Sequence, residues 1–310
     1  MTSAILPPLP VQPPGVDWPT LSWSRGPLPP SVDAERLARL IDRGFTDFEE
    51  THAVVVVQGG RLVLDRYGPA HGPGATCLSW SMAKSITHAL VGIAVGDGLL
   101  DIMAPAPVPE WRSPGDPRGA ITTDQLLRMS SGLRFSEVYE PDKPSDTIEM
   151  MWGSGKADVA GLRGEAFAAF MRERLFKPLG MRTPVPKFDP AGTFIGSSFC
   201  FASGQDFARF GLLYLRDGVW NGRRLLPEGW VDYARTQTFQ QAGVTDDPYG
   251  AHWWLGLGGE GSFSANGHEG QFTLLAPDLD LIIVRHGRTG AALKDALKVW
   301  MGEMAAAFRT

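Results

Sequence analysis

The sequence predicts an α+β protein in which an antiparallel β-sheet is flanked by N- and C-terminal helices and a mainly helical domain is inserted. Strand-like runs occur at residues 52–67 and again between residues 252 and 286. Helical spacing dominates the stretch between them, and an amphipathic segment lies outside them on each side. Strands from the two ends of a chain usually meet in one sheet, so the middle forms a second unit.

These signals divide the 310 residues into three parts. Residues 1–30 hold nine prolines, which favour extended backbone, and we expect an arm lying over the body. Residues 31–98 and 240–310 are assigned to the sheet domain, and residues 99–239 to the helical domain. A chain of this length commonly holds two structural units.

The first elements have clear local signals. Ser31 caps a helical stretch whose apolar stripe includes Leu37 and Ile41. Residues 52–57 are apolar and β-branched, and residues 61–67 alternate between apolar and polar. Because two glycines separate these runs, they predict a β-hairpin.

The remaining elements follow in order. Apolar residues recur at helical spacing from 81 to 95, and Gly96-Asp97-Gly98 ends that helix. A capping box at residues 122–125 starts a short helix. Further helices are expected at residues 165–175, 205–215, 227–233 and 291–308, and strands at residues 252–255, 272–275 and 279–286.

The composition excludes several classes of protein. Apolar residues make up 43% of the chain, and 29 basic against 34 acidic residues leave a net charge of −5, so no nucleic-acid partner is expected. No apolar run reaches the roughly 18 residues of a membrane span, and the first ten residues do not resemble a secretory signal. Two cysteines, Cys77 and Cys200, fit a reducing compartment. We expect a cytoplasmic protein without a membrane partner.

The strongest chemical signal is Ser81-Met82-Ala83-Lys84 at the start of a predicted helix. Spacing of three places the serine hydroxyl and the lysine amine on one helix face. A lysine whose pKa is depressed by burial can take the serine proton, and the helix N-terminus offers N–H groups to an oxyanion. The alternative is an ordinary capping serine followed by a solvated lysine.

Together with three later stretches, this motif resembles the serine β-lactamase and penicillin-binding-protein superfamily. The likeness is closest to its class-C-like branch of esterases, D-amino-acid peptidases and nylon-oligomer (aminohexanoate-dimer) hydrolases. It covers about residues 50 to 305. The stretches are Thr123-Asp124-Gln125-Leu126-Leu127-Arg128-Met129-Ser130-Ser131-Gly132-Leu133, Leu175-Phe176-Lys177-Pro178-Leu179-Gly180-Met181 and Asp206-Phe207-Ala208-Arg209-Phe210-Gly211-Leu212-Leu213.

The resemblance implies a β-lactamase/transpeptidase-like fold and further site residues. His268-Glu269-Gly270 occupies the place of the family's third motif, which lines the site on a strand. A glycine at 270 lets backbone approach a ligand closely, and we assign the second oxyanion donor, beside the Ser81 N–H, to the N–H of Gln271. A His in place of Lys removes a permanent cation, which favours esters and small amides over penicillins. By position, Tyr139 matches a substrate-contacting Tyr of the nylon-oligomer hydrolases.

The chain departs from the family at its second motif, Tyr-x-Asn or Tyr-x-Ser, whose Tyr shares the base role. Only residues 154–163 lie at the corresponding place, and they contain no Tyr. Tyr139 is a candidate substitute, although an ordinary loop role is equally compatible with its sequence position.

Other motifs indicate neither a cofactor nor a metal. Residues 256–261 satisfy G-x-G-x-x-G, but they lead into a strand rather than opening a helix onto a dinucleotide. The six histidines lack metal-ligand spacing.

We therefore expect a serine hydrolase that cleaves small esters or amides through an acyl-Ser81 intermediate, with Lys84 as base. Tyr139, His268, Gly270 and Gln271 are the expected substrate or oxyanion residues. The alternative is a catalytically impaired relative that binds ligand or is a shortened remnant of an enzyme. The sequence leaves the oligomeric state open.

Overall fold

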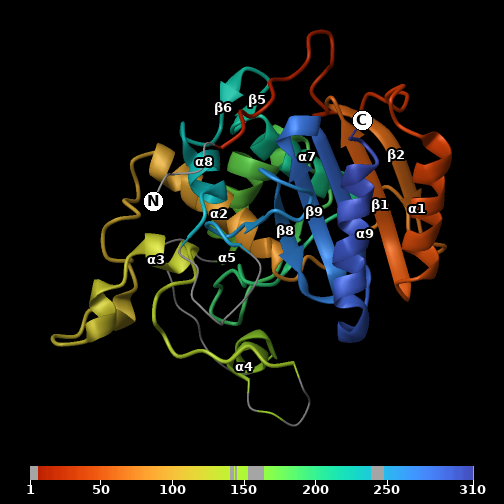
Figure 1. The fold of residues 1–310 in the computed structure, drawn as a ribbon. Helices are drawn as coiled ribbons and strands as arrows, with labels where there is room; N and C mark the ends of the chain where they lie inside the picture. Colours follow the sequence, from red (N-terminus) through yellow and green to blue (C-terminus); the bar gives the residue numbers. More distant parts are fainter. Residues whose placement is uncertain (1–5, 140–142, 144, 153–163, 239–247, 310) are drawn as a thin grey trace.

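The computed structural model describes residues 6–139, 143, 145–152, 164–238 and 248–309. Its centre is a six-stranded antiparallel sheet in the order β2-β1-β10-β9-β8-β7 (Figure 1). The prediction that both ends of the chain share one sheet is therefore confirmed. The strands are β1 (Glu50–Gln58), β2 (Arg61–Tyr67), β7 (Trp254–Leu255), β8 (Phe263–Gly267), β9 (Gln271–Ala276) and β10 (Leu281–Arg288).

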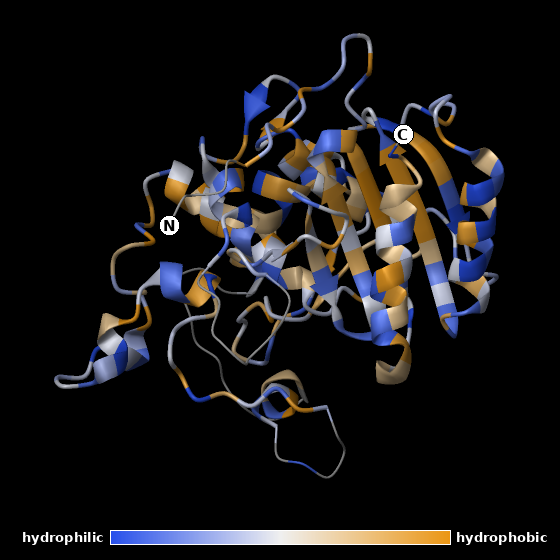
Figure 2. Cartoon of the chain, in the orientation of Figure 1, coloured by the Kyte–Doolittle hydropathy of each residue, from blue (hydrophilic) through white to orange (hydrophobic). Residues whose placement is uncertain are grey.

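The seam between the two ends is the pairing of β1 with β10, in which Val55 lies opposite Val284. Along β1, Val54 and Val56 belong to the apolar cluster on one face, while Val55 and Val57 belong to the cluster on the other. Side chains of a strand alternate between faces, so a strand covered on both sides is a continuous apolar run. Figure 2 shows this run as the orange centre of the sheet.

Helices cover both faces of the sheet. On one face, α1 (Ala34–Thr46) and α9 (Lys294–Ala306) pack together, and the indole of Trp300 donates to the carbonyl of Leu40 at 2.8 Å. On the other face, α2 (Met82–Gly96) and α7 (Gly204–Leu215) pack on the sheet and share one hydrophobic core. The predicted flanking helices near both ends of the chain are thus present.

The chain between β2 and β7 is mainly helical within its described residues. Two two-stranded sheets interrupt it, and their strands are only two residues long. Besides α2 and α7, its helices are 3₁₀ turns at Pro109–Trp111 and Pro117–Ala120, α3 (Thr123–Leu127), α4 (Asp146–Trp152), α5 (Gly164–Met171), a π-helical turn at Arg172–Phe176, α6 (Lys177–Leu179) and α8 (Trp230–Arg235). The short strands are β3 (Val185–Pro186), β4 (Cys200–Phe201), β5 (Val219–Trp220) and β6 (Arg223–Arg224).

Two strand predictions begin too early. Strand β7 starts at Trp254 rather than at residue 252, because His252 has a left-handed φ of 56°. Strand β10 starts at Leu281 rather than at residue 279, because Pro277–Leu279 forms a 3₁₀ turn and Asp280 has a φ of 47°. A strand cannot continue through a residue in the left-handed region.

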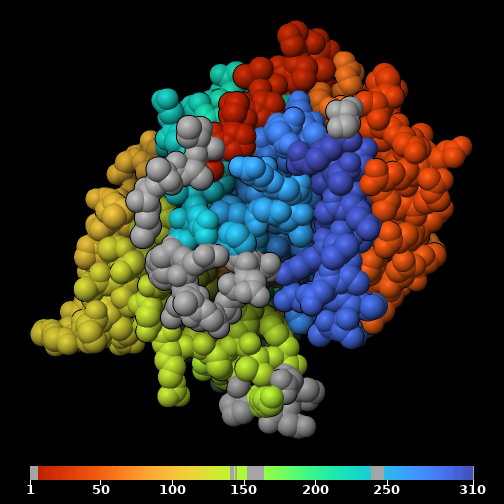
Figure 3. All heavy atoms as spheres, in the orientation of Figure 1, coloured from red at the N-terminus to blue at the C-terminus, as the bar shows by residue number. Residues whose placement is uncertain are grey.

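The proline-rich segment lies across the body. Trp23 is buried in the core, and the carbonyl of Pro19 accepts from Arg209 Nε at 2.8 Å. Leu62 of the edge strand β2 donates to the Ser24 carbonyl and accepts from Gly26, so this segment also covers the sheet edge. Figure 3 shows the segment in red, on the surface beside β5–β6. In the described part of the chain, no helix has the length and apolar character to cross a membrane.

Candidate active site

Ser81 is the N-cap residue of α2 and directly follows a residue with strained backbone angles. Trp80 has a φ of 45°, in a region that bulky residues rarely adopt, and Ser81 then takes up helical backbone angles. The Ser81 side chain makes no capping hydrogen bond. Instead, Lys84 Nζ lies 2.9 Å from Ser81 Oγ and donates to it. The pair is therefore not the capping serine and solvated lysine of the alternative interpretation.

Lys84 is held inside the protein. Its Nζ also donates to the carbonyl of Ser197 at 3.1 Å. Burial lowers the pKa of Lys84, and the negative charge of Glu137 opposes that shift. Removing an ammonium group from water disfavours its charged form, so burial moves this amine toward the neutral state that a base requires.

The backbone of Lys84 is fixed by His252, which lies two residues before β7. The ring Nδ1 of His252 lies 2.8 Å from the Lys84 carbonyl, and the hydroxyl of Ser85 donates to the His252 carbonyl at 2.7 Å. Burial, with the neighbouring Lys84 charge, lowers the pKa of His252 to about 3. This ring is therefore neutral at pH 7 and adds no second cation beside Lys84.

An aromatic cluster stands beside the nucleophile. The rings of Tyr139 and His268 stack with centroids 4.2 Å apart, and the His268 ring meets the edge of the Trp80 indole at 5.1 Å. Burial lowers the pKa of His268, while the charges of Glu269 and Glu137 oppose the shift. The structure thus brings Tyr139 and His268 together next to Trp80, the residue that precedes Ser81.

Tyr139 is arranged as a donor. Its hydroxyl donates to Glu137 at 2.8 Å. Burial and this carboxylate raise the pKa of Tyr139 well above its ordinary value. Its phenol therefore stays protonated at neutral pH, which is the opposite of what a phenolate base needs.

The other two predicted residues, Gly270 and Gln271, have clear packing roles. Gly270 has a φ of 80°, and a Cβ there would lie 2.3 Å from Leu297 and 2.7 Å from Arg285, so its missing side chain faces the protein interior. The buried amide of Gln271 donates to the Gly287 carbonyl and accepts from the Gly287 N–H. Their roles toward substrate, including the Gln271 N–H as oxyanion donor, stay predictions.

Another glycine, Gly267, lies against the two residues that precede Ser81. A Cβ at Gly267 would lie 2.4 Å from the Ser79 carbonyl and 3.1 Å from Trp80 Cβ. The end of β8 therefore runs directly against the turn into α2, and only a residue without a side chain fits there.

Sequence reasoning missed Ser197, Glu137, His252 and Glu269 at this site. Lys84 Nζ donates to the carbonyl of Ser197, and the ring of His252 contacts the carbonyl of Lys84. Because every residue has a backbone carbonyl, the sequence gives no signal for these two contacts. Glu269 and Glu137 lie close in the sequence to predicted residues, since Glu269 belongs to the His268-Glu269-Gly270 motif and Glu137 is two residues before Tyr139. The predicted absence of a second-motif Tyr concerns residues 154–163, all of which lie outside the described residues.

Within the described residues, no three His, Cys, Asp or Glu side chains lie close enough together to bind a metal ion.

Comparisons with known proteins agree on one family. The family model described as Beta-lactamase matches residues 45–296. A 6-aminohexanoate-dimer hydrolase of Paenarthrobacter ureafaciens is 25% identical over 84% of this chain and 80% of its own length. Among solved structures, a protein from Bacillus anthracis provisionally assigned as a 6-aminohexanoate-dimer hydrolase superposes with a TM-score of 0.68 at 19% identity, over 97% of this chain and 90% of that one. A penicillin-binding-protein homologue from Caulobacter crescentus gives a TM-score of 0.66 at 18% identity, over 91% and 99%. The predicted family resemblance and fold are thereby confirmed.

Proposed function

Because the chain belongs to the beta-lactamase family, we propose that it is a serine hydrolase that cleaves small esters or amides through an acyl-Ser81 intermediate. The observation that carries this proposal is the 2.9 Å separation between Ser81 Oγ and Lys84 Nζ, with Lys84 partly buried so that its pKa is lowered. A positioned nucleophile and base within hydrogen-bond reach are the minimum machinery of acyl transfer.

The reaction proceeds in two halves. In the first, neutral Lys84 takes the proton of Ser81 as Oγ bonds to the substrate carbonyl carbon. Lys84 then returns this proton to the leaving alcohol or amine as the carbon–heteroatom bond breaks. In the second half, water attacks the acyl-Ser81 ester, Lys84 takes a water proton, and Ser81 recovers its proton when the acid departs.

The oxyanion of each tetrahedral intermediate is assigned to two backbone donors, the N–H groups of Ser81 and Gln271. The Ser81 N–H lies at the N-terminus of α2, where the helix dipole favours negative charge. Each such donor contributes about 10²–10³ in rate in other hydrolases.

The surroundings of the site favour neutral substrates with a flat or apolar portion. His268, with its lowered pKa, gives no fixed cation to hold a substrate carboxylate. The rings of Trp80, Tyr139 and His268 offer stacking surfaces beside the nucleophile. The relative from Paenarthrobacter acts, by its name, on an aminohexanoate dimer, which makes linear amides the class to test after short esters.

The test is reaction with a fluorophosphonate, read by intact mass. We expect one adduct on the unmodified protein, none on Ser81→Ala, and strongly slowed labelling of Lys84→Ala. Ser113→Ala, which alters an exposed loop serine, is the matched control and keeps full labelling. A folded protein that forms no adduct would overturn the proposal and favour the alternative, a β-lactamase-fold protein that binds ligand without turnover.

We also propose that this activity serves a small-molecule substrate in the cytoplasm, without nucleic-acid or membrane partners. The cysteines support a reducing compartment such as the cytoplasm, because Cys77 and Cys200 are both buried and neither forms a disulfide. Burial raises the pKa of the Cys77 thiol to about 11 and that of Cys200 to about 12, which keeps both thiols protonated. Fractionation of cells that express the protein, with detection in the soluble cytoplasmic fraction, tests this assignment.

A further inference from the structure

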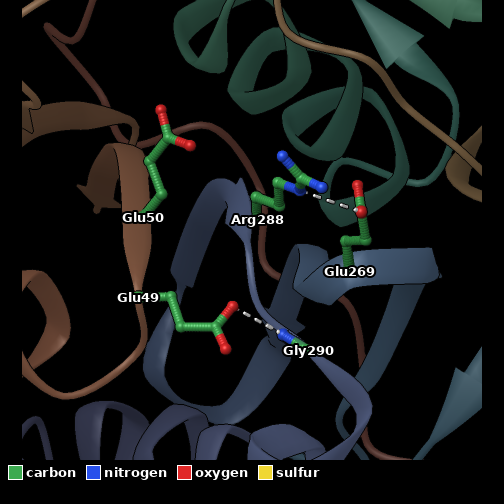
Figure 4. Close-up of a pocket in the computed structure, with 5 residues that line it drawn as sticks. All are labelled: Glu49, Glu50, Glu269, Arg288 and Gly290. Atoms are coloured by element: carbon green, nitrogen blue, oxygen red, sulfur yellow. Dashed lines mark hydrogen bonds and ion pairs between the residues drawn. The ribbon is translucent and has the colours of Figure 1, made fainter.

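The turn between β8 and β9 joins the nucleophile to a pocket on the neighbouring surface. This pocket, of about 360 Å³, is lined by Glu49, Glu50, Glu269, Arg288 and Gly290 (Figure 4). Glu269 is shared between the pocket and the active site, because its Oε2 accepts from the indole Nε1 of Trp80 at 3.2 Å. Its other oxygen, Oε1, pairs with Arg288 at 3.4 Å.

The backbone of Glu269 is fixed independently of its carboxylate. The Glu269 carbonyl accepts from Arg285 Nη1 at 3.2 Å, from the Thr289 N–H at 3.1 Å and from the Gln271 amide at 3.3 Å. These three donors belong to β9, β10 and the residue that follows β10. The carboxylate therefore extends toward Trp80 from a rigid platform.

Trp80 needs such an anchor. Its φ of 45° is costly for a bulky residue, and such strain persists only where surroundings over-determine the conformation. Packing against His268 restrains the indole, and the close passage of Gly267 restrains Trp80 Cβ. The hydrogen bond to Glu269 is a polar restraint on the indole. Because Trp80 and Ser81 share a peptide bond, a change in the strained backbone angles of Trp80 moves the Ser81 N–H and Oγ.

We propose that the Glu269 carboxylate is a positioning residue for the nucleophile, which holds the Trp80 indole and thereby keeps Ser81 aligned with Lys84 and the oxyanion donors. This inference rests on the proposed serine-hydrolase function. Its energetic basis is that misplacing reacting groups by about 1 Å can cost about 10²-fold in rate.

The experiment compares four variants in fluorophosphonate labelling rate and in p-nitrophenyl acetate hydrolysis. Glu269→Ala removes the acceptor, and we expect the labelling rate and kcat to fall at least tenfold with KM within threefold. Glu269→Gln keeps an oxygen for the indole and loses the ion pair with Arg288, and it restores activity to within threefold of the unmodified protein. Trp80→Phe removes the donor and lowers the rate as Glu269→Ala does.

The double variant, Trp80→Phe with Glu269→Ala, separates positioning from general damage. If both act through one hydrogen bond, the double variant is no slower than the slower single variant. Glu50→Ala is the matched control, since Glu50 lines the same pocket but pairs with His52 rather than with Trp80, and it keeps full activity. Melting temperatures of all variants show that each is folded.

The outcomes separate the two proposals. Absence of labelling in the unmodified protein overturns the proposed function itself. If the unmodified protein is labelled, then equal labelling of Glu269→Ala overturns the positioning role alone. Equal losses in Glu269→Gln and Glu269→Ala would also overturn it, because the charge toward Arg288 rather than the indole bond would then be the effective element.

Discussion

At the first turn of α2, the chemistry depends on whether one buried amine carries a proton. The folded environment lowers the pKa of Lys84 mainly through burial, so the neutral amine becomes available at a lower pH than for a free lysine. A base of this kind is inactive when protonated. Activity therefore rises with pH as Lys84 loses its proton.

We predict that kcat/KM for a neutral ester increases with pH along a single ionisation below the ordinary lysine pKa and then reaches a plateau. Lys84→Arg keeps a long cationic side chain that does not deprotonate, and it is expected to lose at least 10²-fold in kcat/KM with no such rise. The measurement is a pH–rate profile of both proteins. If Lys84→Arg kept both the activity and the pH profile of the unmodified protein, Lys84 would be excluded as the base.

The sequence was sufficient for those residues whose partners are close along the chain. Ser81 and Lys84 meet because one helical turn joins them, and this contact follows from spacing alone. Glu269 and Ser197 reach the same place from more than a hundred residues away, and a single sequence holds no measure of that proximity. Gly270 illustrates the limit, since the side chain of Leu297 that a Cβ at Gly270 would meet is distant along the chain.

At the scale of elements, long apolar patterns were predicted well. The β1–β2 hairpin has its turn at Gly59 and Gly60, both with positive φ as the two-residue turn requires. The four two-residue strands were not predicted, because pairing of two residues leaves no periodic pattern to recognise. The second-motif region, residues 154–163, lies outside the described residues, so the absence of its Tyr stays a prediction.

Helix α2 contains a glycine whose role is decided by packing. A Cβ at Gly92 would lie 2.3 Å from the indole Nε1 of Trp230, an atom that donates to the His88 carbonyl of the same helix. Alanine is the better helix former by about 1 kcal/mol, yet here it displaces α8 from α2.

We predict that Gly92→Ala lowers the free energy of unfolding by about 1–3 kcal/mol. Gly302→Ala in α9 is the matched control, because a Cβ there meets only the Leu257 carbonyl, at an ordinary 3.4 Å. That variant is expected to gain about 0.5–1 kcal/mol. Urea denaturation of the two variants measures both changes, and a stabilised Gly92→Ala would contradict the packing of α8 on α2.

At the scale of the whole molecule, the proline-rich segment is part of the core rather than an appendage. Trp23 is 9% exposed in the main apolar cluster, whereas Leu21, two residues earlier, is 78% exposed. We predict that Trp23→Ala lowers the free energy of unfolding by about 3–5 kcal/mol. Leu21→Ala is expected to stay within about 0.5 kcal/mol. Equal urea midpoints for these two variants would show that the segment does not contribute to the core.

The buried histidines make the folded protein sensitive to acid. Burial lowers the pKa of His252 and of His286 to about 3, below the value of roughly 6.5 expected in the unfolded chain. Between these values the unfolded state binds more protons, so stability is lost as the pH falls from about 6.5 toward 3.

Each histidine is expected to remove up to about 1.4 kcal/mol per pH unit across this window. Melting temperatures measured from pH 7 to 4 test the prediction. The slope should decrease in His286→Gln even if that variant is less stable at pH 7, and an unchanged slope would contradict it.

The pairing of β1 with β10 joins two strands that the ribosome makes at very different times. Val55 leaves the ribosome early, but Val284, its partner across the seam, is made after nearly the whole chain. At roughly 5–20 residues per second, the valine run of β1 waits roughly ten to fifty seconds for the strand that covers its edge. During that interval it is an open strand edge of the kind that aggregates. The yield of folded protein should therefore rise when cells that produce it have more chaperone or grow at lower temperature.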